Sequence, residues 1–444
     1  MPALPSCAVR KNVQLAYRVS RRHSYGGIDD MSGQDWFRDY SLLALRLNRQ
    51  VTSNTGGTVL IYQGPSQWSA EVAGEQPLPP EKLVDDADRL LATLPFEPAR
   101  SRYLAAQIRA MRAVARRQCG GQLPLADYAR ECLGLEVSWV PETEFEQAHD
   151  RLDAALPAGR GSLSDRLHAW QAAHALAAER VQRQLPVIVG QAIAETRVRT
   201  DAMIVSLPPD EVVDCELVTG THFWGAGAYE GGRKATLYIN TDIPFNLADL
   251  LYLVAHEVHP GHIAEALLKQ IHLVDGQGVI DQQVRFMLSP PFALGEGLGL
   301  HAESIIFPGD EAREWLTDNV FAAERIQPDG SDLASIHEVK NTLWGVLANV
   351  AFLADEGRPD AELAGYLARW GLYDGNEIAA AFNSIRAPGM SVYVLGYYFG
   401  WQLVRSWLNT PDRFLRVRRL LTEQLLPADL EAGWPSSTPA TNPR

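Results

Sequence analysis

Three histidines and one glutamate lie within residues 256–262, although the whole chain of 444 residues has only 11 histidines. The stretch reads His256-Glu257-Val258-His259-Pro260-Gly261-His262, and apolar residues flank it on both sides. Burying such polar side chains without partners costs free energy, and a bound metal ion would supply a partner. In zinc hydrolases two histidines hold the metal and a nearby glutamate takes a proton from water, so this stretch indicates a metal site.

The position of Pro260 leaves two histidines as candidates for the second ligand. A proline inside a helix removes a hydrogen bond and clashes with the carbonyl four residues earlier, here that of His256. On an ideal helix His262 would point well away from His256, because six residues correspond to about 600° of rotation. A kink at Pro260-Gly261 would bring His262 back. His259, one turn from His256, is the competitor on helical geometry alone.

A second stretch, residues 295–303, could supply a third ligand. Glu296 and Glu303 are seven residues apart and so share one face of a helix. The glycines at 295, 297 and 299 each cost a helix roughly 1 kcal/mol relative to alanine, which is understandable if a backbone or ligand approaches closely. Two histidines and one glutamate with an open water position form a known catalytic zinc site. The alternative is a loop-to-helix junction with solvated acids.

Together the two stretches resemble the domain-of-unknown-function 885 family, regarded as metallopeptidases. That family carries His-Glu-x-x-Pro-Gly-His and then Glu-Gly-x-Ala, and it is distantly similar to helical gluzincins such as thermostable carboxypeptidases and oligopeptidases. The likeness includes residues 232–241, Pro388-Gly389-Met390 and Tyr393-Val394-Leu395-Gly396, where the family has Pro-Gly-Gln and Tyr-x-x-Gly. Two positions depart from the pattern: Ile263 replaces a second histidine, and Gly299 replaces the alanine.

The resemblance implies one zinc ion per chain, with His256, His262 and Glu296 as ligands. It also implies that Glu257 is the general base and that the Tyr393 hydroxyl stabilises the oxyanion. The implied fold is mainly α, a helical gluzincin-like metallopeptidase with a deep cleft. The residues expected to support these groups or to contact substrate are His259, Glu265, Glu303, His301, His222 and Arg386.

Composition narrows the classes of partner. The formal net charge of −14 argues against nucleic acid and anionic membranes as main partners. The four cysteines form no Cys-x-x-Cys pair, which argues against a cysteine zinc site. Their low number predicts a reducing, cytoplasmic location. No uncharged apolar run reaches 18 residues, so no membrane span is expected.

Hydrophobic periodicity and breaker residues predict four regions: a flexible basic arm (1–30), a helical domain (31–206), a metal-binding catalytic domain (207–430) and a disordered tail (431–444). Helices are expected to begin near Ser32 and to cover 81–94, 99–118, 124–133, 142–156, 164–185 and 187–200. Residues 58–62 are expected to form a strand and 66–80 a loop. Residues 212–218 and 235–240 are expected to form a small antiparallel sheet beside the metal-binding helix, with His222, Trp224 and Tyr229 as candidates to line the cleft. The chain after Leu247 is expected to be helical through about Trp407.

These observations favour a soluble zinc-dependent hydrolase, and the family resemblance implies that its substrates are short peptides or small amides. The metal would activate water, and Glu257 would take its proton and pass it to the leaving amine. The edge of the small sheet could bind an extended peptide. Two alternatives stay open: a metal-dependent enzyme that modifies a small metabolite, and a non-catalytic metal-containing binding protein. Retention of Glu257 favours chemistry, because a structural metal site needs no base. The oligomeric state is left open.

Overall fold

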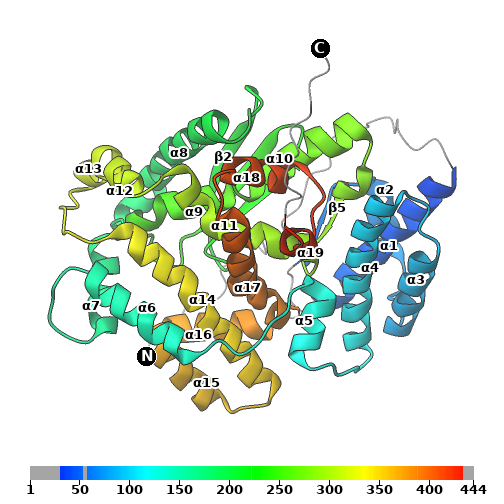
Figure 1. The fold of residues 1–444 in the computed structure, drawn as a ribbon, viewed down its shortest axis with the longest axis horizontal. Coiled ribbons are helices and arrows are strands. Elements are labelled where there is room, and N and C mark those ends of the chain that lie inside the picture. The colour runs from blue at the N-terminus through cyan, green and yellow to red at the C-terminus, as the bar shows by residue number, and fades with distance from the viewer. Residues whose placement is uncertain (1–30, 54–57, 222, 388, 434–444) are drawn as a thin grey trace, which may run out of the picture.

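The computed structural model describes residues 31–53, 58–221, 223–387 and 389–433. The basic arm expected for 1–30, and residues 434–444 of the expected tail, lie outside the described residues. The described chain is mainly helical, as expected, and it contains two small sheets (Figure 1). In the described part of the chain, no helix is both long enough and apolar enough to cross a membrane.

The N-terminal helices pack at one end of the molecule (Figure 1). They are α1 (Met31–Thr52), α2 (Ser66–Gly74), α3 (Pro80–Ala92), α4 (Pro98–Gln118) and α5 (Leu125–Leu133). The expected loop at 66–80 was wrong, because residues 66–74 are helix α2. Its stability depends on α1: the ring of Trp68 lies 5.9 Å from that of Phe37, and Arg38 pairs with Glu71 at 2.7 Å. Local sequence alone does not show these contacts.

The next helices are α6 (Glu142–Ala155), α7 (Leu163–Ala173) and α8 (Ala178–Met203). The expected break near Pro186 was misplaced, since Pro186 lies inside α8 and the chain breaks between α7 and α8 instead. At that break Leu176 donates to the carbonyl of Phe245 at 2.8 Å, and Leu247 donates to that of His174 at 2.9 Å. A distant segment therefore ends α7 by offering its backbone an alternative partner.

The three-stranded sheet contains β2 (Val212–Val218), β3 (Gly225–Gly231) and β4 (Lys234–Asn240), in the order β2-β4-β3. The expectation of an antiparallel sheet was wrong in part: β3 pairs antiparallel with β4, but β2 pairs parallel with it. Gly231, Gly232 and Arg233 have positive φ and turn the chain directly from β3 into β4. Since β3 takes that side of β4, β2 occupies the other side.

A two-stranded antiparallel sheet, β1 (Leu60–Tyr62) with β5 (Val284–Phe286), ties the N-terminal helices to the later chain. Sequence periodicity predicted β1 but not β5. The remaining helices are α9 (Leu250–Glu257), α10 (His262–Lys269), α11 (Pro290–Ile306), α12 (Glu311–Leu316), α13 (Ala322–Glu324), α14 (Leu333–Asp355), α15 (Asp360–Tyr366), α16 (Gly375–Arg386), α17 (Met390–Leu408), α18 (Arg413–Thr422) and α19 (Pro427–Glu431). Short 3₁₀ turns cover Leu247–Asp249 and Ile280–Gln283, and π-helical turns cover Gln270–Asp275, Thr317–Phe321 and Leu367–Gly371.

Apolar side chains form two large cores that meet at the central helices α11 and α17. One core joins residues 140–205 to most of the later apolar residues, and the other joins α1, α3, α4 and α5 to residues 280–293 and parts of α14 and α17. Helices α11 and α17 approach very closely: a Cβ on Gly297 would lie 2.4 Å from the carbonyl oxygen of Gly400. This contact explains one of the glycines in the 295–303 stretch.

Candidate metal centre

The break between α9 and α10 turns His262 back toward His256. Helix α9 ends at Glu257, and the amide of Gly261 folds over its end to donate to the carbonyl of Ala255 at 3.0 Å. A Cβ on Gly261 would lie 1.7 Å from the carbonyl oxygen of His256, so only glycine fits there. As a result, the Nε2 atoms of His256 and His262 lie 3.1 Å apart.

Helix α11 brings a carboxylate to the same point. Glu296 Oε2 lies 3.4 Å from His256 Nε2, and Glu296 Oε1 lies 3.4 Å from His262 Nε2. Ligand atoms at 2.0–2.1 Å from a tetrahedral zinc ion are about 3.3 Å from one another. Each histidine Nε2 atom is therefore about this far from the other and from one oxygen of Glu296, a spacing compatible with a zinc ion. Glu296 Oε2 is buried without a hydrogen-bond partner among the described residues, as expected of an atom placed to hold a cation.

The charges at this point attract one another strongly. Burial disfavours the ionised Glu296, but His262 and His256 outweigh burial and hold the pKa of this carboxyl well below its usual range. Burial also disfavours a charged His262, but Glu296 and then Glu257 and Glu265 outweigh it and raise the pKa of His262 to about 9. Glu296 is thus ionised at neutral pH and available as a ligand, and metal binding would displace a proton from the histidine pair.

Glu257 is held beside the two histidines by strand β3. Ligand-type atoms of His256, Glu257 and His262 all lie within 4.8 Å of one another. The amide of Gly227 donates to Glu257 Oε2 at 2.8 Å. A Cβ on Gly227 would lie 2.4 Å from the carbonyl oxygen of Glu257, so β3 can pass this closely only because residue 227 is glycine. Glu257 therefore has a fixed orientation at the site without a direct pairing to either histidine.

Two tyrosines from α17 stand next to Glu296. The hydroxyl of Tyr393 donates to Glu296 Oε1. Tyr397, one turn later and only half-buried, contacts Tyr393 edge-to-face with the ring centroids 5.6 Å apart, and it stacks on Trp344 at 4.1 Å. Burial, followed by the charge of Glu296, raises the pKa of both phenols well above 10. Both therefore remain proton donors at neutral pH.

The structure turns His259 away from this cluster. Its fully buried ring contacts Glu211 Oε1 at 2.9 Å, and Glu211 also lies 3.3 Å from Arg197. Glu265 does lie close to His262: a Cβ on Gly295 would be 3.2 Å from Glu265 Oε2 and 3.8 Å from the His262 ring.

Glu265 is also paired with two cations. Lys269 donates to it at 2.7 Å and Arg285 at 3.0 Å. Burial opposes its ionised form, but Lys269 and Arg285 outweigh burial and lower the pKa of Glu265. Glu265 therefore contributes a fixed charge beside His262 rather than an open ligand atom.

The other residues proposed from sequence lie elsewhere or outside the described chain. His301 contacts the carbonyl of Trp401 at 3.0 Å, and its burial lowers the pKa of His301 to about 4. Arg386 is exposed and pairs with Asp360. Glu303 faces His337 on α14 at 2.6 Å. His222 lies outside the described residues.

The two aromatic residues proposed for a cleft are packed within the fold. Trp224 lies against Phe245, with the ring centroids 6.2 Å apart. Tyr229 is buried on β3, and its hydroxyl accepts a hydrogen bond from the amide of Arg233 at 3.4 Å.

Sequence reasoning missed three functional candidates. The Gly227 amide was missed because glycine-rich segments favour turns over strands. Tyr397 had a usable signal, since it lies four residues after Tyr393 on one helix face. His337 had none, because its carboxylate partners lie at least 34 residues away in the sequence.

A second group of ligand-type side chains, His168, Asp374 and Glu377, has a structural explanation. Asp374 caps α16 by accepting from the amides of Asn376 and Glu377, and Glu377 accepts in return from the amide of Asp374 at 2.8 Å. His168 contacts the same Glu377 oxygen at 3.2 Å. Asp374 and Glu377 therefore form the N-terminal cap of α16, and His168 packs against it.

Comparison with known proteins supports the fold alone. No known protein-family pattern matches the chain. No curated protein matches it either. Among solved structures, one described as "the putative lipoprotein from Colwellia psychrerythraea" is similar, with a TM-score of 0.50 and 14% sequence identity over 87% of this chain and 67% of that one. At this identity the likeness extends to the arrangement of helices and says nothing of the chemistry.

Proposed function

We propose that this chain is a zinc-dependent hydrolase, a metallopeptidase that cleaves short peptides or small amides and has a gluzincin-like helical fold around a cleft. His256, His262 and Glu296 would hold the zinc ion. One observation carries the proposal: on three helices, the Nε2 atoms of His256 and His262 lie 3.1 Å apart, and each lies 3.4 Å from one oxygen of Glu296, distances close to those between the ligand atoms of a tetrahedral zinc site. When bound, zinc would polarise the substrate carbonyl and make water more acidic.

Glu257 is placed to move the proton. It follows a ligand directly in sequence and lies within 4.8 Å of both histidines, yet its Oε2 atom is oriented by the Gly227 amide. Its second carboxylate oxygen is available to accept a proton from water and to deliver it to the leaving amine. A purely structural metal site would gain nothing from this fixed base.

The hydroxyls of Tyr393 and Tyr397 have different roles in this proposal. A hydroxyl has one proton to donate, and that of Tyr393 is directed to Glu296. Tyr393 could turn from Glu296 to the oxyanion when substrate binds, as the family resemblance implies. Alternatively, Tyr393 positions the ligand carboxylate, and the half-buried Tyr397 donates to the oxyanion. We favour the second assignment, because it leaves each hydroxyl with one fixed task.

Strand β3 offers a place for an extended substrate. It is an edge of its sheet, it packs on α9 and α10, and its Gly227 amide reaches the base. A peptide that adds to this edge would pass beside Glu257. The site is nearly enclosed, with the side chains of His256 and His262 only 10% and 17% exposed. This enclosure favours small substrates, so modification of a small metabolite is the second candidate.

We propose a reducing, cytoplasmic location on the basis of the cysteines. Cys119, Cys132 and Cys215 are free thiols. The description of the similar solved structure as a lipoprotein gives the competing location, a membrane surface. Fractionation of cells that express the full chain would decide between the two.

The proposal is tested by metal analysis of the native protein followed by digestion of a peptide library. We expect about one zinc per chain and cleavage that a chelator abolishes. Glu257→Gln should keep its zinc and lose roughly 10²–10⁴ in turnover, whereas Glu314→Gln, at an exposed position on α12, should behave as wild type. Protein that neither contains nor takes up metal would exclude a metalloenzyme. Unchanged turnover of Glu257→Gln would show that another group is the base.

A further inference from the structure

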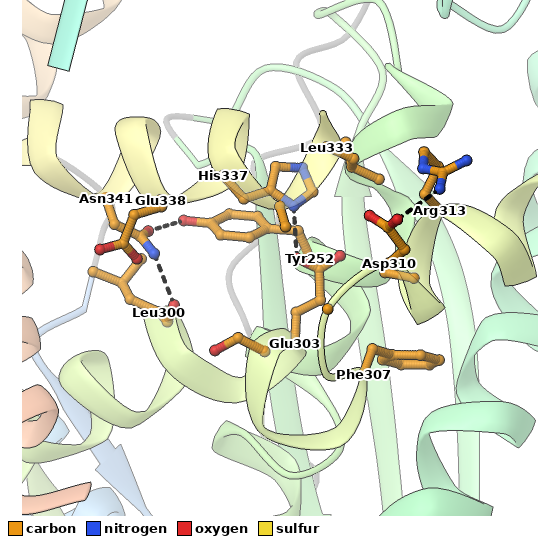
Figure 2. Close-up of a pocket in the computed structure, with 14 residues that line it drawn as sticks. Tyr252, Leu300, Glu303, Phe307, Asp310, Arg313, Leu333, His337, Glu338 and Asn341 are labelled. Carbon is orange, nitrogen blue, oxygen red and sulfur yellow. Dashed lines mark hydrogen bonds and ion pairs between the residues drawn. The ribbon is translucent and has the colours of Figure 1, made fainter. Parts of the chain in front are cut away.

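A pocket of about 80 Å³ opens between α11, α14 and the start of α12, away from the proposed zinc ligands (Figure 2). Its lining combines carboxylates with apolar walls from Leu300, Phe307 and Leu333. On α11 the pocket residue Glu303 lies seven residues beyond Glu296, which is about 10 Å along the helix axis. The pocket is therefore separate from the metal centre, although it shares helices with it.

The floor of the pocket is a buried cluster of charges. His337 contacts Glu303 Oε2 through Nδ1 at 2.6 Å and Asp249 Oδ1 through Nε2 at 3.0 Å. Both ring nitrogens face carboxyl groups, and because ionised carboxylates only accept, an imidazolium that donates from both nitrogens satisfies both contacts. Burial opposes this charge, but Glu303 and Asp249 outweigh it and raise the pKa of His337 to about 9. Lys340 pairs with Asp249 as well.

One carboxylate oxygen of this cluster is left over. Glu303 is 7% exposed, and its Oε1 atom is buried without a hydrogen-bond partner among the described residues. In Figure 2 the carboxylate of Glu303 reaches up to His337, and its other oxygen points toward the space beside Asp310. A buried carboxylate oxygen without a hydrogen-bond donor costs free energy, and a ligand in the pocket that donates to this atom would remove that cost.

The surroundings favour a donor that carries positive charge. Asp310 and Glu338 also line the pocket; Asp310 pairs at 2.9 Å with Arg313, another lining residue, and Glu338 pairs at 3.3 Å with Arg405, whose side chain is 55% exposed. His337, which also lines the pocket, and Lys340 both pair with Asp249. The lining therefore sets three carboxylates against the cations of Arg313 and His337, and the Glu303 carboxylate keeps a buried oxygen without a hydrogen-bond partner among the described residues.

We propose that this pocket binds a small ligand with a primary ammonium group and a short apolar stem. The ammonium would donate to Glu303 Oε1, and the stem would lie against Phe307 and Leu333. The volume suits a ligand of this size, because a single water needs only about 10–15 Å³ by the same kind of measure. This site does not depend on the hydrolase proposed above, since it uses none of the zinc ligands and neither the base nor the phenols.

The probe is n-butylamine, titrated at pH 7 into the full metal-loaded chain and followed by ligand-observed NMR. We expect a dissociation constant on the order of 1 mM, with 1-butanol and butyrate binding at least tenfold more weakly. Glu303→Gln should weaken butylamine binding at least tenfold. Ala334→Trp, at an exposed pocket residue outside the charge cluster, should do the same by filling the entrance, even if Glu303→Gln does not fold.

Glu314→Gln is the matched control, because it removes an exposed carboxylate of α12 outside the pocket lining. It should bind butylamine as wild type does. The proposal is overturned if butylamine shows no saturable binding to wild type with a dissociation constant less than tenfold above the expected value. It is also overturned if Ala334→Trp binds butylamine as wild type does, which would place the amine elsewhere, for example at the zinc. Equal binding of 1-butanol would overturn the assignment of an ammonium group.

Discussion

The imidazole of His256 lies against the α-carbon of Gly299. A Cβ on Gly299 would meet three atoms of that ring at 2.6–2.9 Å, closer than a side-chain carbon can approach. The glycine that departs from the family pattern therefore makes room for a proposed zinc ligand. An alanine here therefore requires the ring or the backbone of α11 to shift.

Gly299→Ala should accordingly push His256 out of its position and weaken zinc binding. The expected loss is roughly 10–100-fold, the size usual for displaced support of a metal ligand. Competition with a chromogenic chelator measures it. Gly190→Ala is the control: it is an exposed helical glycine with nothing within 4 Å of the added Cβ, and it should keep zinc and gain up to about 1 kcal/mol of stability. Wild-type zinc affinity in Gly299→Ala would show that the His256 ring can shift to admit the methyl group, so that residue 299 does not control zinc binding.

His262 and His259 should respond differently to substitution by alanine. His262→Ala should lose the metal, because it removes one of three ligand atoms. His259→Ala should keep it and lose about 1–3 kcal/mol of stability, since Glu211 would remain buried with only Arg197 beside it. Metal analysis and thermal unfolding of both variants test this pair. The reverse pattern of metal retention would mean that helical spacing identifies the ligand better than the break at Pro260-Gly261.

Replacing each tyrosine by phenylalanine distinguishes a hydroxyl that positions a zinc ligand from one that acts on the substrate. Tyr393→Phe should lower zinc affinity roughly 10–100-fold, because Glu296 loses the hydroxyl that orients it. Tyr397→Phe should keep zinc and lose roughly 10² in kcat if its hydroxyl serves the oxyanion. Zinc competition and turnover on any cleaved amide, measured at saturating zinc, give both quantities. If Tyr393→Phe lost kcat but kept its zinc affinity, Tyr393 would be the residue that donates to the oxyanion, and Tyr397 would not.

The imidazolium between Glu303 and Asp249 makes stability depend on pH. The pKa of His337 is about 9 when folded and 6.5 in a model peptide. The contribution of the protonated His337 ring to the free energy of unfolding is therefore complete below about pH 6.5. It is lost as the pH rises through about 9, by an amount on the order of 3 kcal/mol. The groups that face it are Asp249, Glu303, Lys340 and the ring of Tyr252.

Urea unfolding of wild type and His337→Gln between pH 6 and 9.5 measures this contribution. The difference in unfolding free energy between the two should shrink as the pH rises. Removing the ring also leaves Glu303 and Asp249 without their shared partner, so the variant should be less stable at pH 6. A difference that does not change with pH would mean that the ring is neutral in the folded protein.

The sequence by itself determined the helical character of the chain and the composition of the candidate site. Helix α1 could be predicted because Trp36, Tyr40, Leu43 and Leu47 recur at helical spacing, and all four are buried. The residues near the proposed zinc position could be named because two of the three proposed ligands, the base and the Pro260-Gly261 break lie within one short stretch, and Glu296 lies in a second one. Such local patterns are readable because their physical causes, backbone geometry and side-chain periodicity, act between near neighbours.

Only the tertiary structure decided how these residues meet. Whether His262 or His259 joins His256 depends on Gly261 folding onto the end of α9 and on Glu211, 48 residues before His259, taking up the other ring. Strand β3 has poor strand propensity, yet it forms by pairing with β4, and the close approach of α9 leaves room only for glycine at position 227. The His337 cluster joins three segments far apart in the chain. Contacts of this kind arise from close approach of distant backbones and from burial of charge, neither of which has a local sequence pattern.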